Sequence, residues 1–445
     1  MMLKRLLLGF AMTIVSASAV WAQGHMLHGV GPINSSMGGA GTGLPEDAVA
    51  ALMYNPALVG AEPGNQLTFS TEFFTTAILI DVKAYGKTGQ GKSTPALGVV
   101  PAFGWMLGAP DGKLGLGFGL IGIAGFQTDY AQQPGTIIFE KAKDGGFGRI
   151  FTDYNVAKIP IAISYKATPK LTFGLSLNLY RANLAIAPLP YDVFDTVTLT
   201  ANSDTTLGYQ NGLRFFPEGG NQNGRFAVSG QFGVFYKPSE TFSVGASVTT
   251  PQNYKPFTWN SYFADPTSAD FGGGRKIKYD LDGPLFIGVG VGIKPTPKIS
   301  MAIDGTWSKY KGVAGFGSPG GIVGGIVQPF GWRNIAAFKF GTRFQATEKM
   351  DLRIGYSFSQ TPLQSKNVLT ATGAPATFQN HITMGAGIKM FPFLTMEASF
   401  YYVPREHVKG PFLIDQLGPN PPATPGTMDT SNTITSAVMG LYFRF

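Results

Sequence analysis

The sequence contains no cysteine and little charge. None of its 445 residues is a cysteine, which excludes disulfide bonds, thiolate metal sites and a catalytic thiol. Charged residues make up only 13% of the chain, whereas roughly 25% is typical of soluble proteins. The net charge of +8 is spread thinly, without a run of lysine and arginine. We therefore expect no nucleic-acid partner.

The sequence also lacks a stretch suited to a membrane helix once its first 22 residues are set aside. The nearest candidate, residues 312–332, contains eight glycines and two prolines, which would break a helix. If the mature chain crosses a membrane, it must therefore do so with strands.

The first 22 residues have the pattern of a secretory signal peptide. Lys4 and Arg5 precede a short apolar run, residues 6–15, and small residues follow it. We expect cleavage after Ala22, with Ala19 as the alternative. The chain is therefore expected to be exported.

Glycine, aromatic residues and a strict alternation of apolar residues are what the chain does contain. Apolar residues occupy every second position in several segments, and a period of two predicts strands. Membrane barrels show this pattern over roughly ten residues, because one face meets lipid and the other the lumen. A soluble sandwich would alternate in the same way, so the pattern alone leaves both open. The clearest examples are residues 171–179, 351–358 and 382–390.

The connections between strands favour the membrane barrel. Short turns and long loops follow one another in strict alternation, which is typical of an outer-membrane barrel and has no counterpart in a sandwich. We therefore expect an all-β fold, a fourteen-stranded antiparallel transmembrane β-barrel. The expected strands lie near 66–80, 96–107, 114–127, 153–166, 171–187, 225–237, 241–256, 276–293, 299–310, 334–345, 350–360, 379–390, 394–406 and 433–445.

The last expected strand ends on Phe445 at the C-terminus. A terminal phenylalanine on an alternating strand resembles the assembly signal of outer-membrane proteins. We therefore expect the protein in the outer membrane of a Gram-negative bacterium. Its expected partners are outer-membrane lipid, lipopolysaccharide and the assembly machinery.

Residues 23–65 show no alternation and precede the barrel. Glu46 and Asp47 would open a short alanine-rich helix, which Pro56 would end. Such a small apolar segment cannot fold alone, so we expect it to form a plug, or hatch, inside the lumen; a periplasmic tail is the alternative. The expected organisation is a signal peptide at 1–22, a hatch at 23–65 and a barrel at 66–445.

The glycine-rich run that begins at Ser36 and the Asn-Pro-Ala motif at Asn55, Pro56 and Ala57 resemble the hatch of FadL-type transporters. This family includes long-chain fatty acid transporters and TodX-like aromatic hydrocarbon transporters. The resemblance implies a monomer that carries hydrophobic molecules passively across the outer membrane. The cargo would be long-chain fatty acids or aromatic or aliphatic hydrocarbons.

The third expected strand changes the phase of its alternation. Leucine and phenylalanine alternate with glycine as far as Leu120, and Ile121 and Ile123 then occupy the face that the glycines held. Gly122 and Gly125 would permit the bulge or kink that this change requires. In the resembling family, a kink in the third strand opens a lateral gate in the wall. An ordinary bulge is the alternative.

Two further features concern the entrance and the cargo. The loop 311–333, with Phe316 and Phe330, is unusually apolar for an exposed loop, and either lines the entrance or packs against other loops. Among the cations on the lumen face, Lys339 is high enough on its strand to meet a cargo carboxylate. We therefore treat Lys339, Phe316 and Phe330 as candidate substrate contacts.

A general diffusion porin and an outer-membrane lipid hydrolase are the alternative functions. A porin would have no plug, and its lumen would be wide, polar and strongly charged. The four histidines lie in no recognisable catalytic motif, and the pair His25 and His28 indicates a metal site only weakly. We expect no catalytic residue, no metal and no cofactor.

Overall fold

The computed structural model describes residues 24–61, 64–84, 86–108, 112–140, 147–187, 219–262, 269, 272–320, 322–323, 326–327, 329–412 and 426–445. The expected signal peptide and most of the loop 188–224 lie outside these residues. No helix among the residues described is long and apolar enough to cross a membrane.

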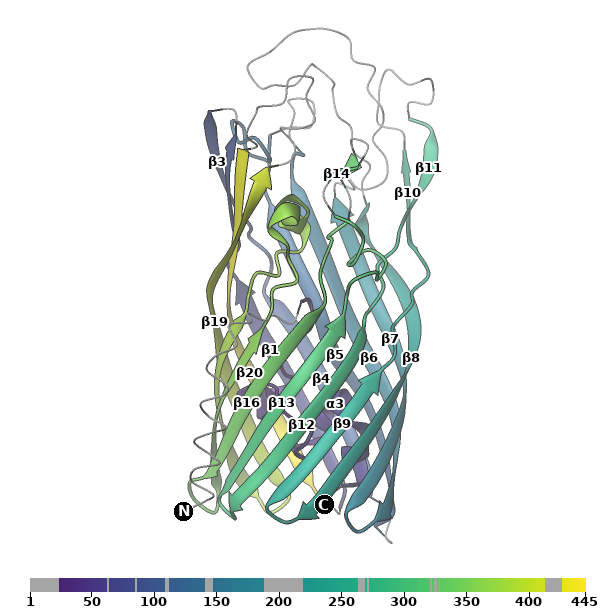
Figure 1. Cartoon of the computed structure of the whole chain (residues 1–445), viewed down its shortest axis with the longest axis vertical. Coiled ribbons are helices and arrows are strands. Elements are labelled where there is room, and N and C mark those ends of the chain that lie inside the picture. Colours follow the sequence, from purple (N-terminus) through teal and green to yellow (C-terminus); the bar gives the residue numbers. More distant parts are fainter. Residues whose placement is uncertain are drawn as a thin grey trace, which may run out of the picture.

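An antiparallel sheet closes on itself to form the barrel (Figure 1). Neighbouring strands along the chain pair with each other, and β1 (Gln66–Thr76) pairs with β20 (Gly426–Arg444) to complete the ring. In the described part of the chain fourteen strands make this wall, which confirms the predicted fold. The other twelve are β4 (Gly98–Gly108), β5 (Leu114–Tyr130), β6 (Ile150–Thr168), β7 (Leu171–Ala187), β8 (Gly219–Ser239), β9 (Phe242–Thr249), β12 (Leu285–Thr296), β13 (Ile299–Lys309), β16 (Ile335–Gln345), β17 (Met350–Ser359), β18 (Asn380–Phe391) and β19 (Leu394–Phe412).

The side chains of the wall are arranged in the reverse of a soluble protein. On β7 the apolar Leu175 and Leu177 are 58% and 59% exposed, whereas Ser176 and Asn178, which alternate with them, are buried. The same alternation holds on β5 up to Leu120. An apolar outer face is stable only against lipid, so the alternation that predicted the strands also identifies the surface that meets the bilayer.

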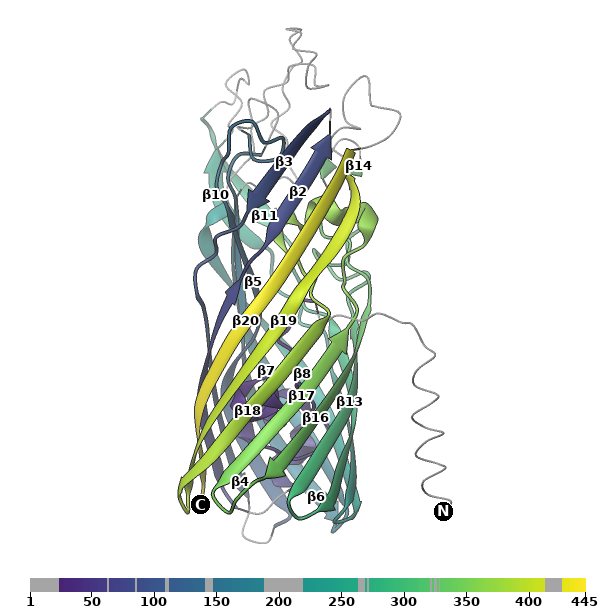
Figure 2. The same ribbon diagram turned by 90° about the vertical axis from the view of Figure 1, so that its left-hand side faces the viewer.

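Several strands differ from the expected boundaries. The expected loop 81–95 contains a hairpin of β2 (Leu79–Ala84) and β3 (Lys87–Lys92), and β19 and β20 extend far into the expected loop 407–432 (Figure 2). These extensions pair with one another above the rest of the wall. The strand boundaries predicted for them were too short, because strands beyond the lipid need no apolar alternation.

The expected strand 276–293 is wrong as a single strand. It consists of β11 (Gly274–Tyr279), which pairs with β10 (Phe257–Tyr262), and of the wall strand β12. The Asp282-Gly283-Pro284 sequence interrupts it, since proline cannot donate to a ladder. Smaller elements in the upper loops are β14 (Ile322–Val323), β15 (Ile326–Val327) and the 3-10 helix η4 (Ser365–Gly373).

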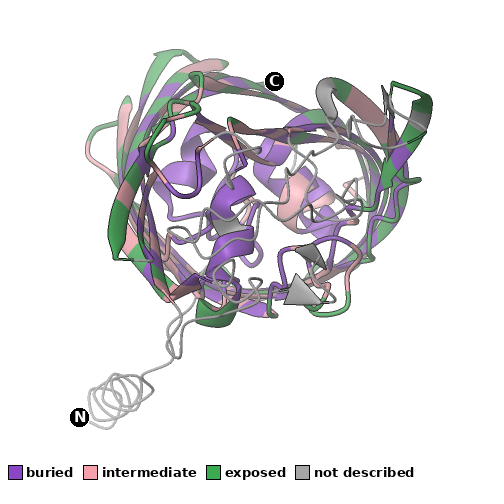
Figure 3. Ribbon diagram, turned by 90° about the horizontal axis from the view of Figure 1, so that it is seen from above, coloured by how far each residue is buried: buried purple, intermediate pink, exposed green. Residues whose placement is uncertain are grey.

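The N-terminal segment, residues 24–61, lies inside the ring of strands (Figure 3). It contains the helices α2 (Gly31–Ser36) and α3 (Ala48–Tyr54) and the 3-10 helix η1 (Pro56–Gly60). The Asp47 carboxylate caps α3 by accepting the Ala50 N–H at 2.8 Å. Val49 and Leu52 are fully buried against the wall, which supplies the apolar surface that so short a segment lacks by itself.

Glycines on the inner face of the wall make room for this segment. A Cβ atom at Gly233 of β8 would overlap Asn55 Oδ1 and would lie 2.9 Å from Cδ of Pro56. One at Gly174 of β7 would overlap the backbone of Ala57. The wall glycines at which an added Cβ would meet the segment in the same way include Gly104, Gly245, Gly290, Gly341 and Gly355.

Gly233→Val should therefore destabilise the protein by about 1–3 kcal/mol, the usual cost of overpacking a filled interior. Gly230→Val on the same strand is the matched control, because nothing lies within 4 Å of a Cβ atom there. Thermal unfolding in lipid nanodiscs measures both variants. Equal midpoints for the two would contradict close packing of the segment against the wall.

Candidate functional site

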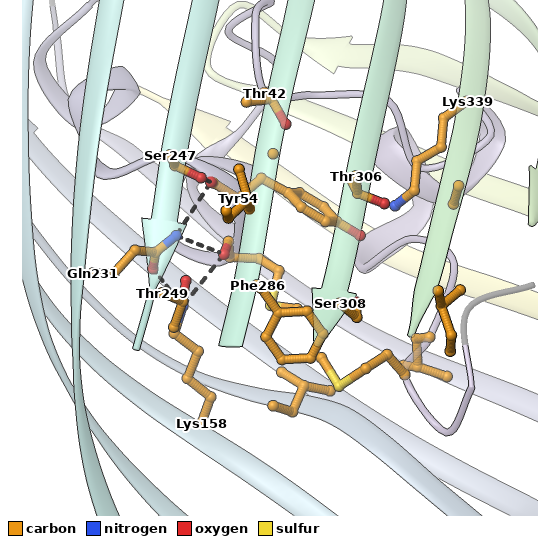
Figure 4. Close-up of a pocket in the computed structure, with 18 of the residues that line it drawn as sticks. Thr42, Tyr54, Lys158, Gln231, Ser247, Thr249, Phe286, Thr306, Ser308 and Lys339 are labelled. Atoms are coloured by element: carbon orange, nitrogen blue, oxygen red, sulfur yellow. Dashed lines mark hydrogen bonds between the residues drawn. The ribbon is translucent and has the colours of Figure 1, made fainter. Parts of the chain in front are cut away.

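A cavity of about 70 Å³ lies between the N-terminal segment and the wall, and we call it the central cavity (Figure 4). It is bounded on one side by Met53 and Tyr54 at the end of α3, and on the other by wall strands that carry both apolar and polar groups. Such a mixed lining suits a small, mainly apolar ligand. Its wall residues include Ile123, Lys158, Gln231, Phe286, Ile335 and Lys339.

Lys158 of β6 binds the end of α3. Its buried ammonium donates to the carbonyls of Leu52 at 2.9 Å and Met53 at 3.3 Å, and to Gln231 Oε1 at 2.8 Å. These three acceptors match the three N–H donors of the ammonium. The last carbonyls of a helix have no partner within the helix, so Lys158 supplies one. Lys158 thus anchors the N-terminal segment to the wall.

Lys339 of β16 lies across the central cavity from Lys158 (Figure 4). Its ammonium donates to the carbonyl of His28 at 2.9 Å and lies 4.8 Å from the centre of the Tyr54 ring. Lys339, the candidate substrate contact, therefore lines the central cavity and holds the N-terminal segment at the same time. Sequence reasoning singled out Lys339 but missed Lys158, although its inward position in β6 could have indicated it.

The Asn-Pro-Ala motif lies below the central cavity and anchors the chain. The Asn55 amide donates to the carbonyls of Thr42 at 2.9 Å and Val234 at 3.0 Å, and its oxygen accepts the Ala57 N–H at 3.1 Å. Pro56 begins η1 directly after it. The side chain of Asn55 therefore links the glycine-rich run, η1 and the wall.

The glycine-rich run has a second anchor on the wall. Asp304 of β13 accepts the backbone N–H groups of Gly41 at 2.8 Å and Thr42 at 2.7 Å through one carboxylate oxygen. Hydrogen bonds from N–H groups to a carboxylate are stronger than those between neutral groups. This part of the segment is therefore firmly bound, from Gly41 to Ala57.

The wall is interrupted between β4 and β5. Their ladder ends at the pair Ala102–Ile121, and the next residue of β4, Pro101, has no N–H to continue it. The chains meet again only where the Thr94 N–H donates to the Asp129 carbonyl at 2.9 Å. Between these two points no strand pairing joins β5 to the chain on the β4 side.

The same stretch of β5 contains a bulge, and it is covered from inside. The register against β6 shifts between Gly122 and Ala124, and both Ile121 and Ile123 are buried. The Leu27 N–H donates to the Ile123 carbonyl, and the Gly125 N–H donates to the His25 carbonyl, each at 3.0 Å. The start of the N-terminal segment, residues 25–27, thus acts as a short strand against the open edge of β5.

The apolar loop residues lie in an aromatic cluster and not on the outer surface. Phe316 and Phe330 are buried and stack with their ring centres 5.7 Å apart. His25 stacks on Phe316 at 4.4 Å, and its Nδ1 is 2.9 Å from the hydroxyl of Tyr310. Burial lowers the pKa of His25 to about 3, so its ring is neutral. Sequence reasoning missed this role of His25 and the neighbouring Trp332.

His28 and His25 pack against different rings. It stacks on His381 with ring centres 4.6 Å apart, whereas His25 packs among the aromatic rings. Among the described residues no group of three histidine, aspartate or glutamate side chains could hold a metal ion. The two histidines, whose spacing indicated a metal site only weakly, therefore have different ring neighbours.

Two further cavities adjoin the N-terminal segment. The wall cavity, of about 80 Å³, lies beside the interruption and is bounded by Pro95, Ala96 and residues 125–127. The lower cavity, of about 250 Å³, is strongly polar. It contains the ion pairs Arg343–Asp351 at 2.8 Å and Arg353–Glu397 at 2.7 Å.

A closed wall with an apolar outer face and a chain segment inside its lumen define an outer-membrane β-barrel protein. The profile of the family described as outer membrane protein transport protein (OMPP1/FadL/TodX) matches residues 13–411. The chain belongs to this family, which confirms the resemblance seen in the sequence. The family consists of transport proteins, so this protein is not an enzyme.

Solved structures share the fold at low sequence identity. The P. putida toluene transporter TodX has a TM-score of 0.66 and 19% identity, over 94% of this chain and 99% of TodX. For a Pseudomonas aeruginosa FadL homologue the TM-score is 0.70, with 15% identity over 95% and 99% of the two chains. The Ralstonia pickettii toluene transporter TbuX has a TM-score of 0.65 and 16% identity, over 94% of this chain and 99% of TbuX. A comparison with curated proteins gives no match.

Lys158→Met should loosen the end of α3, because it removes the donor to the Leu52 carbonyl and to Gln231 Oε1 and one of the two donors to the Met53 carbonyl. We expect a loss of about 3 kcal/mol in stability and a rise in ion conductance in planar bilayers. Lys166→Met, at the partly exposed periplasmic end of the same strand, is the control. Wild-type protein should conduct little, and a large steady wild-type conductance would indicate an open porin instead.

Proposed function

We propose that the protein takes up hydrophobic molecules passively across the outer membrane and releases them sideways into the bilayer. The observation that carries the proposal is the interrupted wall between β4 and β5, covered from inside by residues 25–27. A hydrophobic molecule that leaves there enters lipid directly and never crosses water. No source of energy is needed, since the molecule moves down its own gradient.

The route has three stages. Cargo first meets the aromatic cluster under the extracellular loops, where Phe316 and Phe330 provide apolar surface. It then occupies the central cavity, beside Lys339. Finally, residues 25–27 leave the edge of β5, and the gate formed by Ile121, Gly122, Ile123 and Gly125 opens towards the lipid.

The rest of the N-terminal segment serves as the hatch. Asn55, Pro56 and Ala57 stay bound to the wall, so the barrel does not become an open pore when residues 25–27 move. In this route residues 41–57 therefore stay fixed, whereas residues 25–27 move. Two backbone hydrogen bonds join residues 25–27 to β5, whereas at least four hydrogen bonds join residues 41–57 to the wall.

The proposal also covers where the protein is located and how it is assembled. The signal peptide would be removed near Ala22, and the strand that ends at Phe445 would be recognised by the outer-membrane assembly machinery. The mature protein would act as a monomer surrounded by lipid and lipopolysaccharide. These points rest on the sequence and on the closed, lipid-facing wall.

The cargo is a long-chain fatty acid or an aromatic or aliphatic hydrocarbon. Two of the similar structures are toluene transporters, which supports the hydrocarbon. The ammonium of Lys339 already donates to the carbonyl of His28 and lies over the Tyr54 ring, so it has partners without a cargo carboxylate. We therefore place uncharged hydrocarbons ahead of fatty acids.

A reversible tether tests the movement of residues 25–27. Met26 and Ala124 are directly opposed in a narrow antiparallel pair, in which Cα atoms lie roughly 4.5 Å apart, a spacing that accepts a disulfide. The chain has no other cysteine. In Met26→Cys/Ala124→Cys, oxidation should abolish uptake of p-xylene into liposomes, and reduction should restore it. Oxidant should not change the uptake of p-xylene by either single variant. Full uptake by the oxidised double variant would exclude the movement of residues 25–27.

Replacement of two glycines tests the gate itself. A Cβ atom at Gly122 would clash with Val100 beside the gap, and one at Gly125 would lie 2.7 Å from the Tyr154 carbonyl oxygen. Gly122→Ala/Gly125→Ala should therefore lower uptake roughly tenfold, or about 1.4 kcal/mol, while the barrel still folds. Gly230→Ala on the lipid face should have no effect, and unchanged uptake in the double variant would count against lateral release.

A further inference from the structure

The apolar outer face of β7 and β8 ends at one row of residues. On β7 the outward side chains are apolar as far as Leu179, and the next outward side chain is the exposed Arg181. The ladder partner of Arg181 on β8 is Phe226, which is 55% exposed. At this end β7 leads into the long connection to β8, and the long connections of such barrels are extracellular. The row of Arg181 and Phe226 therefore marks the upper edge of the lipid-facing surface.

The side chain of Arg181 reaches upwards from this row. Its guanidinium carbon lies 5.2 Å from the centre of the Phe226 ring, within the range of a cation–π contact. Its Nη2 atom would lie only 2.8 Å from a Cβ atom at Gly224, which is two residues above Phe226 on β8. An arginine at the edge of lipid places its charge at the level of the headgroups in this way. The ring and the glycine thus hold the guanidinium above the lipid, and the residue stays exposed.

The hairpin of β10 and β11 stands above the wall near β8 (Figure 1). Asn223 Nδ2 donates to the carbonyl of Thr258 at 2.8 Å, and Arg225 Nε donates to the carbonyl of Pro256 at 2.7 Å. Both donors belong to the part of β8 that the guanidinium of Arg181 contacts. The two hydrogen bonds therefore fix the start of the hairpin at the same height.

The two faces of this hairpin differ in character. Ile277 and Tyr279 of β11 are buried on its inner face. Lys276 and Lys278 alternate with them and are exposed on its outer face. Lys278 is the ladder partner of Thr258, which belongs to the fixed start of the hairpin. The outer face of the hairpin therefore presents lysines just above the edge of the lipid.

These cations form one surface, which we call the basic rim. Its members are Arg181, Lys255, Lys276 and Lys278, and Lys255 is exposed directly before Pro256. In the part of the chain that the structure describes, none of them forms an ion pair with a carboxylate. Asp153 of β6 and Asp280 of β11 share the outer face but are fewer than the cations. The surface is therefore positively charged, and its charges are open to a ligand.

We propose that the basic rim binds the phosphate groups of lipid A, the phosphorylated glycolipid that anchors lipopolysaccharide in the outer leaflet. Cations beside a membrane attract anionic headgroups, and the planar guanidinium of Arg181 suits a phosphate. The cations come from β7, from β11 and from the segment before β10, a spread that suits a headgroup with two phosphates better than a phospholipid with one. The apolar face of β7 below Arg181 would receive the acyl chains. This inference goes beyond uptake and depends only on the location of the protein in the outer membrane.

Binding of lipid A to the mature protein in detergent micelles tests the proposal, with native mass spectrometry as the measurement. Arg181→Gln/Lys278→Gln should lower the affinity for diphosphoryl lipid A about thirtyfold, which corresponds to roughly 2 kcal/mol for two cations at the level of the headgroups. Lipid A without its phosphates should bind equally weakly to wild-type protein and to this variant.

A matched control changes the same number of charges at the other end of the barrel. Lys170→Gln/Lys349→Gln replaces two exposed lysines in the short turns, and it should bind diphosphoryl lipid A as tightly as wild-type protein does. Thermal unfolding without lipid A should give the same midpoint for both variants and for wild-type protein, because all four side chains are exposed.

Three outcomes would overturn the proposal. The first is an unchanged affinity for diphosphoryl lipid A in Arg181→Gln/Lys278→Gln, and the second is an equal loss in the control variant. The third is binding of phosphatidylglycerol to wild-type protein as tight as that of diphosphoryl lipid A, which would show a general attraction to anionic lipid. Uptake of p-xylene into liposomes that contain no lipid A tests the proposed transport separately.

Discussion

Backbone groups in a hydrocarbon layer have no water to bond, and the whole structure depends on this constraint. A sheet meets it only when it closes, as it does here where β1 pairs with β20 from Gln66 to Thr76. Beyond the pair Ala102–Ile121 the ladder between β4 and β5 stops, and part of the exposed edge is bonded instead to residues 25–27. At this place residues 25–27 therefore take the position of a wall strand.

The same constraint acts inside the lumen, where the N-terminal segment is too short to satisfy its own backbone. Wall side chains supply the partners: Asp304 for N–H groups of the glycine-rich run, and Lys158 for carbonyls at the end of α3. Glycines such as Gly233 bring the two backbones close enough for these bonds. Charged side chains and glycines on the lumen face thus hold the N-terminal segment.

The fold could be predicted from the sequence wherever a strand has one face in lipid and the other in the lumen. Lipid on one side imposed the alternation of β7, and the need of Val49 and Leu52 for apolar neighbours predicted a lumen position for their segment. Extensions such as the end of β19 gave no such signal, since both faces lie outside the lipid. Contacts between distant residues were also hidden. Lys158 and Met53 are 105 residues apart, and nothing local to either indicates the pair.

The order in which the chain is made has a consequence for its assembly. The N-terminal segment emerges first, but some of its partners lie in the last third of the chain: Thr383 donates to the carbonyl of Ser36, 347 residues away. The Asn65 N–H likewise donates to the carbonyl of Phe445 at the opposite terminus. The part synthesised first can therefore be locked only when the ring is complete. The contacts of this segment with the last strands can form only after those strands are made, and contacts of such long range slow folding.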